Sequence, residues 1–261
     1  MTTPKVLILR TAGTNCDYET RYAFEKAGAK VDTVHINILL ANKKLLKDYQ
    51  ILTLPGGFTY GDDISAGKIL ANQIKYNLEE DINAFVTDKK LILGICNGFQ
   101  TLTKAGLLPS MNKQQEATLT FNDSNKFEDR WVYLKVCSNK SVFIKEENVP
   151  TIYLPIAHGE GKFVTKDETT LNKIMSNQQV VFKYINECGE EAGYPWNPGG
   201  SIQNIAGICD PTGQILGIMP HPERHVEPTQ HPRWTRNGLK EWGEGFIIFK
   251  NAVSYVKSIF S

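Results

Sequence analysis

Short apolar segments that read as strands recur along this chain with helical patterns between them. This alternation constrains its fold more than any other feature. The segments occupy residues 5–10 (KVLILR), 30–36 (KVDTVHI), 51–54 (ILTL), 91–95 (LILGI), 205–209 (IAGIC) and 215–219 (ILGIM). Strands of a parallel sheet are buried on both faces, so they tend to be apolar throughout instead of alternating. We therefore predict an α/β fold in which helices cover both faces of a mostly parallel central sheet.

Helical spacing of apolar residues fills several of the intervals. It predicts a helix over residues 17–27 capped by Gly28, one long amphipathic helix over 66–86, a helix over 98–105 and a C-terminal helix over 248–260. Residues 117–185 differ, because alternating stretches such as WVYLKV (131–136) predict a small antiparallel portion. The chain has no internal repeat, low-complexity tract or linker, and we predict a single domain over residues 1–261.

Composition excludes several classes of function. The net charge of +1 shows that the chain lacks the strong overall positive charge of a typical nucleic-acid-binding protein. No run approaches the roughly 20 apolar residues of a membrane-spanning helix, and the N-terminal run is too short for a signal peptide. We therefore expect no nucleic-acid or membrane partner. The cysteines are odd in number, widely spaced and without a C-x-x-C pair, which is typical of free thiols in a reducing cytoplasm. They are Cys16, Cys96, Cys137, Cys188 and Cys209.

The stretch LGICNGFQ places Cys96 between two glycines at the C-terminal end of a predicted strand. Functional residues of open α/β sheets collect at this end of the strands, and the start of the following helix favours a thiolate. Gly94 and Gly98 flank Cys96 as glycines flank the serine of a G-x-S-x-G nucleophile elbow, where they permit a sharp turn. The alternative is a small hydrophobic residue in the core. We interpret Cys96 as a candidate nucleophile.

A nucleophilic cysteine needs a base, and His221 in IMPHPERH is the strongest candidate. It also follows an apolar strand directly, so we expect it to emerge at the same sheet edge as Cys96. Pro222 disfavours the helical conformation at His221. In an extended segment Glu223 would point the same way as the imidazole and could orient it. The alternative is that His221 and Glu223 are solvated in a loop.

The histidine-rich string raises the question of a metal site. His221, Glu223, His225 and His231 do not form the H-E-x-x-H pattern. Pro222 also argues against a helix that would place two of the histidines on one face. We expect no metal site.

Three further motifs carry weaker signals. GDDISAGKI (61–69) fails as a phosphate loop, because five residues instead of four separate its glycines and Ile69 replaces Ser or Thr. Cys16 precedes a predicted helix and is a second-choice nucleophile, since the sequence places no histidine near it. LPGGFTYGDD (54–63) follows the third strand, and its successive glycines could turn peptide N–H groups towards an oxyanion. Most Pro-Gly-Gly strings are only turns.

In this order, LPGGF, GICNGFQ and MPHPER resemble the motifs of class I, triad-type glutamine amidotransferases. The longer runs LPGGFTYGDD, GICNGFQTLTKAGLLP, PIAHGEGKF, YPWNPGGS and MPHPER are similar to one branch of that family, the glutaminase subunits of phosphoribosylformylglycinamidine synthases. The resemblance extends from Val6 to the C-terminal helix. It implies a flavodoxin-like amidotransferase fold.

The resemblance also implies roles for residues at the matching positions. Cys96 would attack the side-chain amide of L-glutamine, His221 would shuttle the proton to departing ammonia, and Glu223 would orient His221. The γ-glutamyl thioester on Cys96 would then be hydrolysed to glutamate. The backbone N–H groups of Gly57 and Asn97 would form the oxyanion hole. The residues implied in substrate binding are Gly56, Gln100, His158, Gly159 and Gly161.

The resemblance implies partners as well. Ammonia would pass to a synthetase subunit that uses ATP and Mg to convert formylglycinamide ribonucleotide to its amidine, in a complex with a small adaptor subunit. No cofactor is expected in this chain itself, which has no recognisable nucleotide loop. The alternatives are an amidotransferase subunit of another biosynthetic synthetase, a stand-alone γ-glutamyl hydrolase and a catalytically inactive binding subunit.

The segment over residues 224–249 looks longer than this family usually has. Tryptophan and arginine are typical anchors of protein interfaces, so it is a candidate docking surface for the synthetase. The alternative is a solvated loop whose two tryptophans cover the edge of the core. The candidate docking residues are Arg233, Trp234, Arg236, Lys240 and Trp242.

Overall fold

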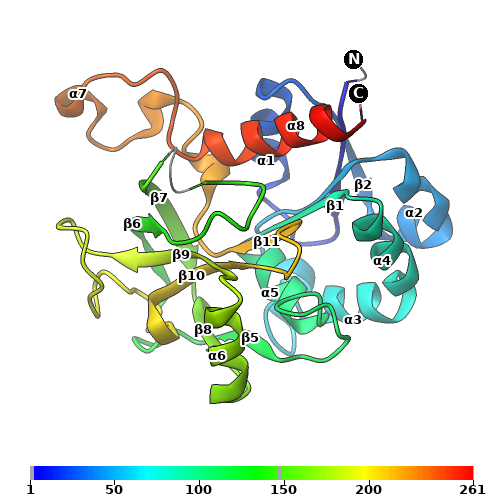
Figure 1. The fold of residues 1–261 in the computed structure, drawn as a ribbon, viewed down its shortest axis with the longest axis horizontal. Helices are drawn as coiled ribbons and strands as arrows, with labels where there is room; N and C mark the ends of the chain where they lie inside the picture. Colours follow the sequence, from blue (N-terminus) through cyan, green and yellow to red (C-terminus); the bar gives the residue numbers. More distant parts are fainter. Residues whose placement is uncertain (1–2, 146–148, 261) are drawn as a thin grey trace.

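A nine-stranded sheet in the order β2-β1-β3-β4-β11-β10-β9-β6-β7 organises the chain (Figure 1). The structure is a computed structural model and describes residues 3–145 and 149–260. A separate pair, β5 and β8, forms a two-stranded sheet. The strands are β1 (Lys5–Arg10), β2 (Lys30–His35), β3 (Ile51–Leu54), β4 (Leu91–Ile95), β5 (Ala117–Thr120), β6 (Glu128–Val136), β7 (Thr151–His158), β8 (Lys162–Thr165), β9 (Val180–Ile185), β10 (Ile205–Cys209) and β11 (Ile215–Ile218).

Half of the large sheet is parallel and half is antiparallel. β2, β1, β3, β4 and β11 pair in parallel, in the strand order of flavodoxin-like folds. β10, β9, β6 and β7 continue the sheet by antiparallel pairing. The predicted α/β fold is confirmed, and so is the antiparallel portion in the middle of the chain, to which β5 and β8 also belong.

Helices cover both faces of the parallel half (Figure 1). α1 and α8 pack on one face, where the rings of Phe24 and Phe249 meet edge to face with centroids 4.9 Å apart. α5, with α3 beside it, covers the other. The α-helices are α1 (Asp17–Lys26), α2 (Ile36–Ala41), α3 (Lys68–Asn77), α4 (Glu79–Thr87), α5 (Asn97–Lys104), α6 (Glu168–Ser176), α7 (Trp234–Asn237) and α8 (Phe246–Phe260). The 3-10 helices are η1 (Lys43–Asp48), η2 (Thr59–Asp62), η3 (Ile202–Asn204), η4 (Pro222–Arg224) and η5 (Pro228–Gln230).

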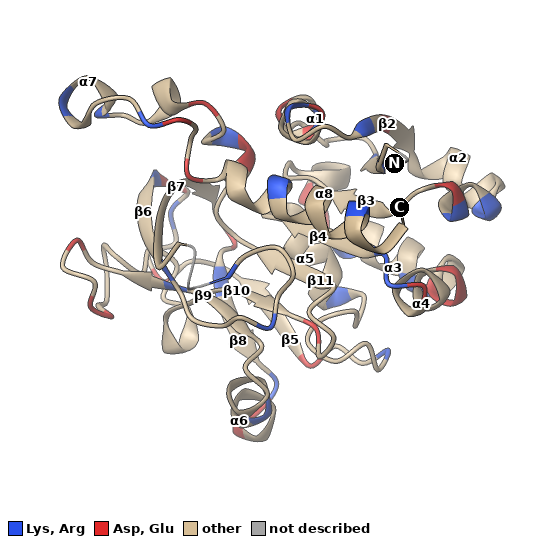
Figure 2. Cartoon of the chain, turned by 45° about the horizontal axis from the view of Figure 1, so that its top comes forward, with Lys and Arg blue, Asp and Glu red and all other residues tan. Residues whose placement is uncertain are grey.

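The central strands consist of buried, uncharged residues. Every residue of β3, β4 and β11 is buried, and charged residues of both signs occur on the helices and loops around them (Figure 2). Such strands are stabilised by removal of apolar surface from water on both faces. Within the described part of the chain, no helix has the length and apolar character needed to cross a membrane.

Several of the predicted elements have different boundaries, most of them by only one or two residues at an end. The long helix predicted over residues 66–86 is wrong, because it is two helices, α3 and α4, separated at Leu78 with φ −120° and ψ 6°. The apolar periodicity continues across the break because Leu78 is itself buried. The predicted strand over 30–36 ends one residue early, where Ile36 begins α2.

Gly98 lets α5 lie directly against β3, and we predict that Gly98→Ala strongly destabilises the fold. A Cβ atom at this position would lie 1.9 Å from the Leu54 carbonyl oxygen, a backbone atom that cannot rotate away. Overpacking of this kind costs about 2–3 kcal/mol. Urea unfolding would measure the loss. As a control, Gly193→Ala places its Cβ where nothing lies within 4 Å, and should change the free energy of unfolding by less than about 1 kcal/mol. Equal effects of the two substitutions would contradict the packing argument.

Candidate active site

The ends of two neighbouring strands bring Cys96 and His221 together. β4 and β11 are parallel neighbours in which Ile95 is paired with Ile218. Cys96 directly follows β4, and its N–H donates to the Ile218 carbonyl at 2.8 Å. His221 follows β11, and its N–H donates to the Pro155 carbonyl on β7 at 2.8 Å. The prediction that both residues emerge at one sheet edge is confirmed.

Cys96 occupies a sharp, strained turn. Its φ of 50° and ψ of −106° lie outside the regions that non-glycine residues usually adopt. Such conformations cost about 1–3 kcal/mol and persist only where the surrounding structure enforces them. The surroundings are tight, because a Cβ atom on Gly94 would lie 2.8 Å from the backbone of Gly98. The sharp turn expected of a nucleophile elbow is therefore present. The role of Cys96 as nucleophile stays a prediction.

His221 and Glu223 form a buried pair. The His221 Nδ1–H donates to Glu223 Oε1 at 2.6 Å, and both side chains are at most 2% exposed. The sequence analysis predicted this contact between His221 and Glu223, but it assigned the wrong backbone conformation to the segment. Glu223 lies in the 3-10 helix η4 rather than in an extended segment, and His221 precedes that turn with φ −104° and ψ 89°. The alternative of two solvated loop residues is therefore wrong.

The electrostatics of His221 suit a proton carrier. Burial alone would lower the pKa of His221, but the Glu223 carboxylate and the Cys96 sulfur raise it well above its ordinary value. Its Nε2 atom is buried without a hydrogen-bond partner among the described residues. Because Nδ1–H is committed to the carboxylate, Nε2 is the atom at which the ring gains and releases its second proton, and the raised pKa favours the protonated ring.

A cavity of about 140 Å³ opens at Cys96. It brings together most of the residues predicted for the oxyanion hole and for substrate binding, and it adds acidic and aromatic residues that sequence reasoning missed. The lining residues are Gly57, Phe58, Asp62, Ala66, Cys96, Gln100, Phe121, Phe127, Ala157, His158, Gly159 and Glu160.

Gly56 and Gly161 are absent from this lining, although both were predicted to bind substrate. A Cβ atom on Gly56 would lie 2.8 Å from His221 Cε1, and one on Gly161 would lie 2.0 Å from His158 Cε1. Both glycines therefore leave room for an imidazole ring. His158 itself is fixed by its Nδ1–H, which donates to Asn122 Oδ1 at 3.0 Å. Burial, followed by the charge of His221, lowers the pKa of His158 to about 3, so this ring is neutral.

The side chains of Asn97 and Gln100 tie the cavity walls to α5. Asn97 Nδ2 donates to Asp62 Oδ1 and to Gln100 Oε1, both at 3.0 Å. Gln100 Nε2 donates in turn to the Glu160 carbonyl at 2.7 Å. Because Asn97 is the first residue of α5, its backbone N–H has no partner within the helix. That N–H is therefore suited to the predicted oxyanion hole.

Asp62 and Glu160 give the cavity a negative wall. Glu160 Oε2 lies 3.6 Å from the buried Lys104 Nζ, whereas Asp62 accepts hydrogen bonds from the Asn97 amide and the Gly67 backbone. Burial, followed by repulsion from Glu160, raises the pKa of Asp62 to about 6. An acidic wall of this kind suits the ammonium group of an amino acid. The two residues stand in the quoted runs LPGGFTYGDD and AHGEG, but the sequence alone does not show that they meet.

Cys16 lies beside His221, which corrects the expectation that no histidine is near it. Its Sγ is 3.9 Å from His221 Nδ1. Among the described residues, the one group of three potential metal donors is Cys16, His221 and Glu223, whose donor atoms lie within 4.8 Å of one another. These residues fit a metal ion poorly, because Nδ1 already binds Glu223 and the Arg224 guanidinium contacts the thiol at 3.1 Å.

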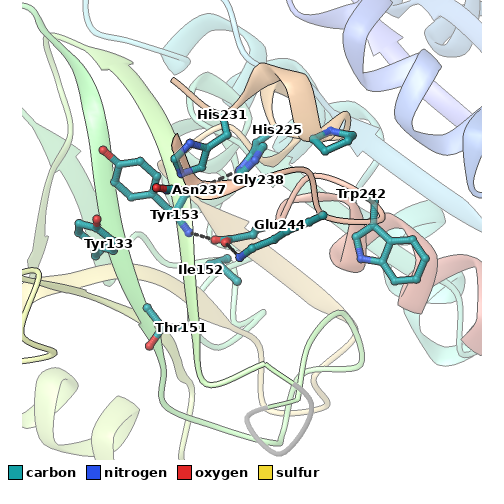
Figure 3. Close-up of a pocket in the computed structure, with 12 residues that line it drawn as sticks. Tyr133, Thr151, Ile152, Tyr153, His225, His231, Asn237, Gly238, Trp242 and Glu244 are labelled. Atoms are coloured by element: carbon teal, nitrogen blue, oxygen red, sulfur yellow. Dashed lines mark hydrogen bonds and ion pairs between the residues drawn. The ribbon is translucent and has the colours of Figure 1, made fainter. Parts of the chain in front are cut away.

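A second cavity, of about 280 Å³, lies between β7 and the segment over residues 225–244 (Figure 3). His225 and Tyr153 line it, and the His225 Nδ1–H donates to the Tyr153 carbonyl at 2.7 Å. Glu244 accepts the Tyr153 N–H at 2.6 Å. Trp242 packs against the core, with Lys250 Nζ 4.0 Å from its ring centroid, as the core-edge alternative expected. The other candidate docking residues are exposed, namely Arg233, Trp234, Arg236 and Lys240.

Comparison with known proteins identifies similar chains. Residues 3–256 match the family described as CobB/CobQ-like glutamine amidotransferase domains. A relative from Dehalococcoides mccartyi, named phosphoribosylformylglycinamidine synthase subunit PurQ, is 49% identical over 260 residues, which cover 99% of this chain and 100% of that relative. A relative of the same name from Archaeoglobus fulgidus is 42% identical, with 98% of each chain covered.

A solved structure is similar as well. One chain of the structure titled "Structure of PurLQS from Thermotoga maritima" aligns with a TM-score of 0.74 and 32% sequence identity. The alignment covers 98% of this chain and 100% of that one.

We predict that Asp62 makes stability fall with rising pH between about 4 and about 6. Its ordinary pKa of 3.8 is raised to about 6 in the folded protein. In that window the folded state retains a proton that the unfolded chain has lost, so deprotonation favours unfolding. Melting temperatures of Asp62→Asn should therefore decline less from pH 4 to pH 6 than those of the wild type. Exposed Asp63 provides the control, since Asp63→Asn should keep the wild-type slope. Indistinguishable slopes for wild type and Asp62→Asn would contradict the assignment.

Proposed function

The chain belongs to the CobB/CobQ-like glutamine amidotransferase family, and we infer that it is the glutaminase subunit of a phosphoribosylformylglycinamidine synthase. It hydrolyses L-glutamine and supplies ammonia to a synthetase subunit in purine biosynthesis. The observation that carries this function is the meeting of the Cys96 elbow with the buried His221–Glu223 pair at one sheet edge, in a chain that matches such subunits over their full length.

Cys96 is the nucleophile in the proposed reaction. His221 Nε2 carries the proton taken from the Cys96 thiol, and the Cys96 sulfur attacks the side-chain amide carbon of glutamine. The Glu223 carboxylate accepts the Nδ1–H and stabilises the imidazolium that forms. Because Glu223 and Cys96 raise the pKa of His221, the imidazolium holds this proton until the leaving group needs it.

The oxyanion that forms on the amide oxygen requires hydrogen-bond donors. We assign this role to the backbone N–H of Asn97, at the start of α5, and to that of Gly57, which lines the cavity. One such donor is worth about 10²- to 10³-fold in rate.

Collapse of the tetrahedral intermediate breaks the C–N bond. His221 gives its proton to the nitrogen, which leaves as ammonia, and a γ-glutamyl thioester remains on Cys96. His221 then takes a proton from water, whose oxygen attacks the thioester carbon. The C–S bond breaks, glutamate leaves and the proton returns to sulfur. The sum is glutamine and water giving glutamate and ammonia.

Ammonia must leave through the mouth of the cavity, and this mouth is unusually apolar. Phe58, Phe121 and Phe127 line it and are 45%, 66% and 53% exposed. The rings of Phe58 and Phe127 stack with centroids 6.3 Å apart. A large exposed apolar patch marks an interaction site. We place the synthetase over this mouth, where it would receive ammonia without release to water.

The remaining assignments follow from this function. ATP and Mg belong to the synthetase, and a small adaptor subunit completes the complex. Five free cysteines and the absence of a membrane-spanning helix among the described residues support a cytoplasmic location.

Loss of the Cys96 thiol should separate the two half-reactions. In the complex reconstituted with its synthetase, Cys96→Ala should lower glutamine-dependent amidine formation by at least about 10³-fold, because the nucleophile is gone. Amidine formation from added ammonia should stay within about twofold of the wild type. Cys188→Ala, at an exposed free cysteine, serves as the control and should retain both activities. A parallel loss of both activities in an intact Cys96→Ala complex would argue against this role.

The location of the docking surface is testable by binding. Phe121→Ser and Phe127→Ser should each weaken binding to the synthetase about tenfold or more, since truncation of interface anchors commonly costs more than 1 kcal/mol. Tyr76→Ser, at an equally exposed aromatic residue on α3, is the matched control. Trp234→Ala and Arg236→Ala test the alternative surface in the segment over residues 224–249. Weakened binding only for these two variants would place the synthetase there instead.

A further inference from the structure

Cys16 is held rigidly against the edge of the His221 ring. It is 1% exposed and follows β1 at the start of α1. Its N–H donates to the Gly56 carbonyl at 3.2 Å, and its own carbonyl accepts the Thr20 hydroxyl at 2.6 Å. A Cβ atom on Gly56 would lie 2.8 Å from His221 Cε1 and 3.0 Å from Cys16 Sγ. The Cys16 thiol and the Gly56 backbone therefore both pack against one edge of the His221 ring.

The Arg224 guanidinium forms a hydrogen bond with the Cys16 thiol and not with Glu223, the residue that precedes Arg224 in the sequence. Arg224 Nη2 donates to Cys16 Sγ at 3.1 Å, and Arg224 Nε donates to Glu19 Oε1 at 3.3 Å. Glu223, next to it in the chain, has a fully buried side chain whose Oε2 has no hydrogen-bond partner among the described residues. A buried carboxylate oxygen without a partner and a nearby guanidinium attract each other strongly, because arginine binds carboxylates in a two-pronged geometry. Arg224 is thus a potential competitor of His221 for Glu223.

The thiol of Cys16 is suited to holding the guanidinium in place. It donates to Asn15 Oδ1 at 3.2 Å while it accepts from Arg224. Burial raises the pKa of Cys16 above its ordinary value, an effect that outweighs the lowering by the His221 hydrogen bond. The sulfur is consequently neutral. It can accept the arginine N–H without placing a second negative charge beside His221.

We propose that Cys16 is a positioning residue whose thiol, together with Glu19, keeps Arg224 away from Glu223 and so reserves that carboxylate for His221. The proposal rests on the function inferred for His221 and Glu223. If the guanidinium paired with Glu223, the imidazolium would lose its main stabilising charge and would release its proton at lower pH. The titratable or charged groups that act on this pair are Cys16 and Glu19 from the β1–α1 region, Cys96 after β4, His158 at the end of β7, and Arg224 in η4.

The test measures the rate at which a glutamine-mimicking alkylating agent labels Cys96, as a function of pH, in the whole chain. Labelling is followed at Cys96 by peptide mass spectrometry. The measurement needs no synthetase, so its outcome does not depend on whether the proposed synthetase partner is correct. Cys16→Ala should shift the alkaline limb of the profile down by about one pH unit, a tenfold loss at alkaline pH. Cys16→Ser, which keeps a hydrogen-bond acceptor, should stay near the wild-type profile.

The decisive variant is the double substitution Cys16→Ala with Arg224→Met. Because it removes the competing cation, it should restore the profile of Cys16→Ala to within about twofold of the wild type. A purely structural role for Cys16 predicts no such rescue, so a double variant as impaired as Cys16→Ala would overturn the proposal. An unshifted profile for Cys16→Ala would also overturn it.

A second variant covers the case in which Cys16→Ala does not fold. Glu19→Gln removes the other anchor of Arg224 at a partly exposed position. It should shift the alkaline limb in the same direction by a smaller amount, and an unchanged profile would count against the proposal. Cys96→Ala supplies the blank for the labelling. If Cys96 is not labelled even in the wild type, the inferred function fails, whereas normal wild-type labelling without the shifts defeats only the role of Cys16.

Discussion

The parallel pairing of β4 with β11 is the constraint on which the rest of this structure depends. The two strands are far apart in the sequence, and their register sets Ile95 opposite Ile218, so the residues that follow them emerge side by side. Cys96 leaves one strand in a strained turn, and His221 leaves the other just before a 3-10 turn. A one-residue slip of this register would move the His221 side chain relative to Cys96 by about 3.3 Å along the strand axis. The pairing of β4 with β11 therefore sets the relative positions of the two side chains assigned to catalysis, Cys96 and His221.

At the C-terminal ends of these strands, the buried charges of His221 and Glu223 lie side by side and stabilise each other. Burial disfavours a charged His221, and the adjacent Glu223 reverses that effect. Each of these side chains keeps one buried atom without a hydrogen-bond partner among the described residues, His221 Nε2 and Glu223 Oε2. Unpartnered buried polar atoms are costly, and one of these two, His221 Nε2, is the atom through which the proton moves in the proposed reaction. The His221 backbone is held in place by its N–H, which donates to the Pro155 carbonyl on β7, and by its carbonyl, which accepts the Arg224 N–H.

Sequence reasoning succeeded where local pattern and strand order were sufficient. Apolar runs located β3, β4 and β11, and the position of Cys96 and His221 at strand ends predicted their meeting. It failed where the answer depended on distant segments. Cys16 and His221 are 205 positions apart, and only the placement of β1 beside β3 brings them into contact. The acidic wall of Asp62 and Glu160 was missed for the same reason. The prediction of one helix over residues 66–86 failed for another reason. Leu78 is buried, so the helical spacing of apolar residues continues across the break between α3 and α4.

The position of β7 at the end of the large sheet has a consequence for self-association. An edge strand exposes peptide groups that can pair with a second molecule and seed aggregation. β7 cannot be shortened, because its last residues, Ala157 and His158, form a wall of the cavity. Near its start, the Tyr153 N–H is already occupied by the Glu244 carboxylate. The segment over residues 224–249, which supplies Glu244, thus occupies part of the β7 edge and discourages the addition of a further strand there.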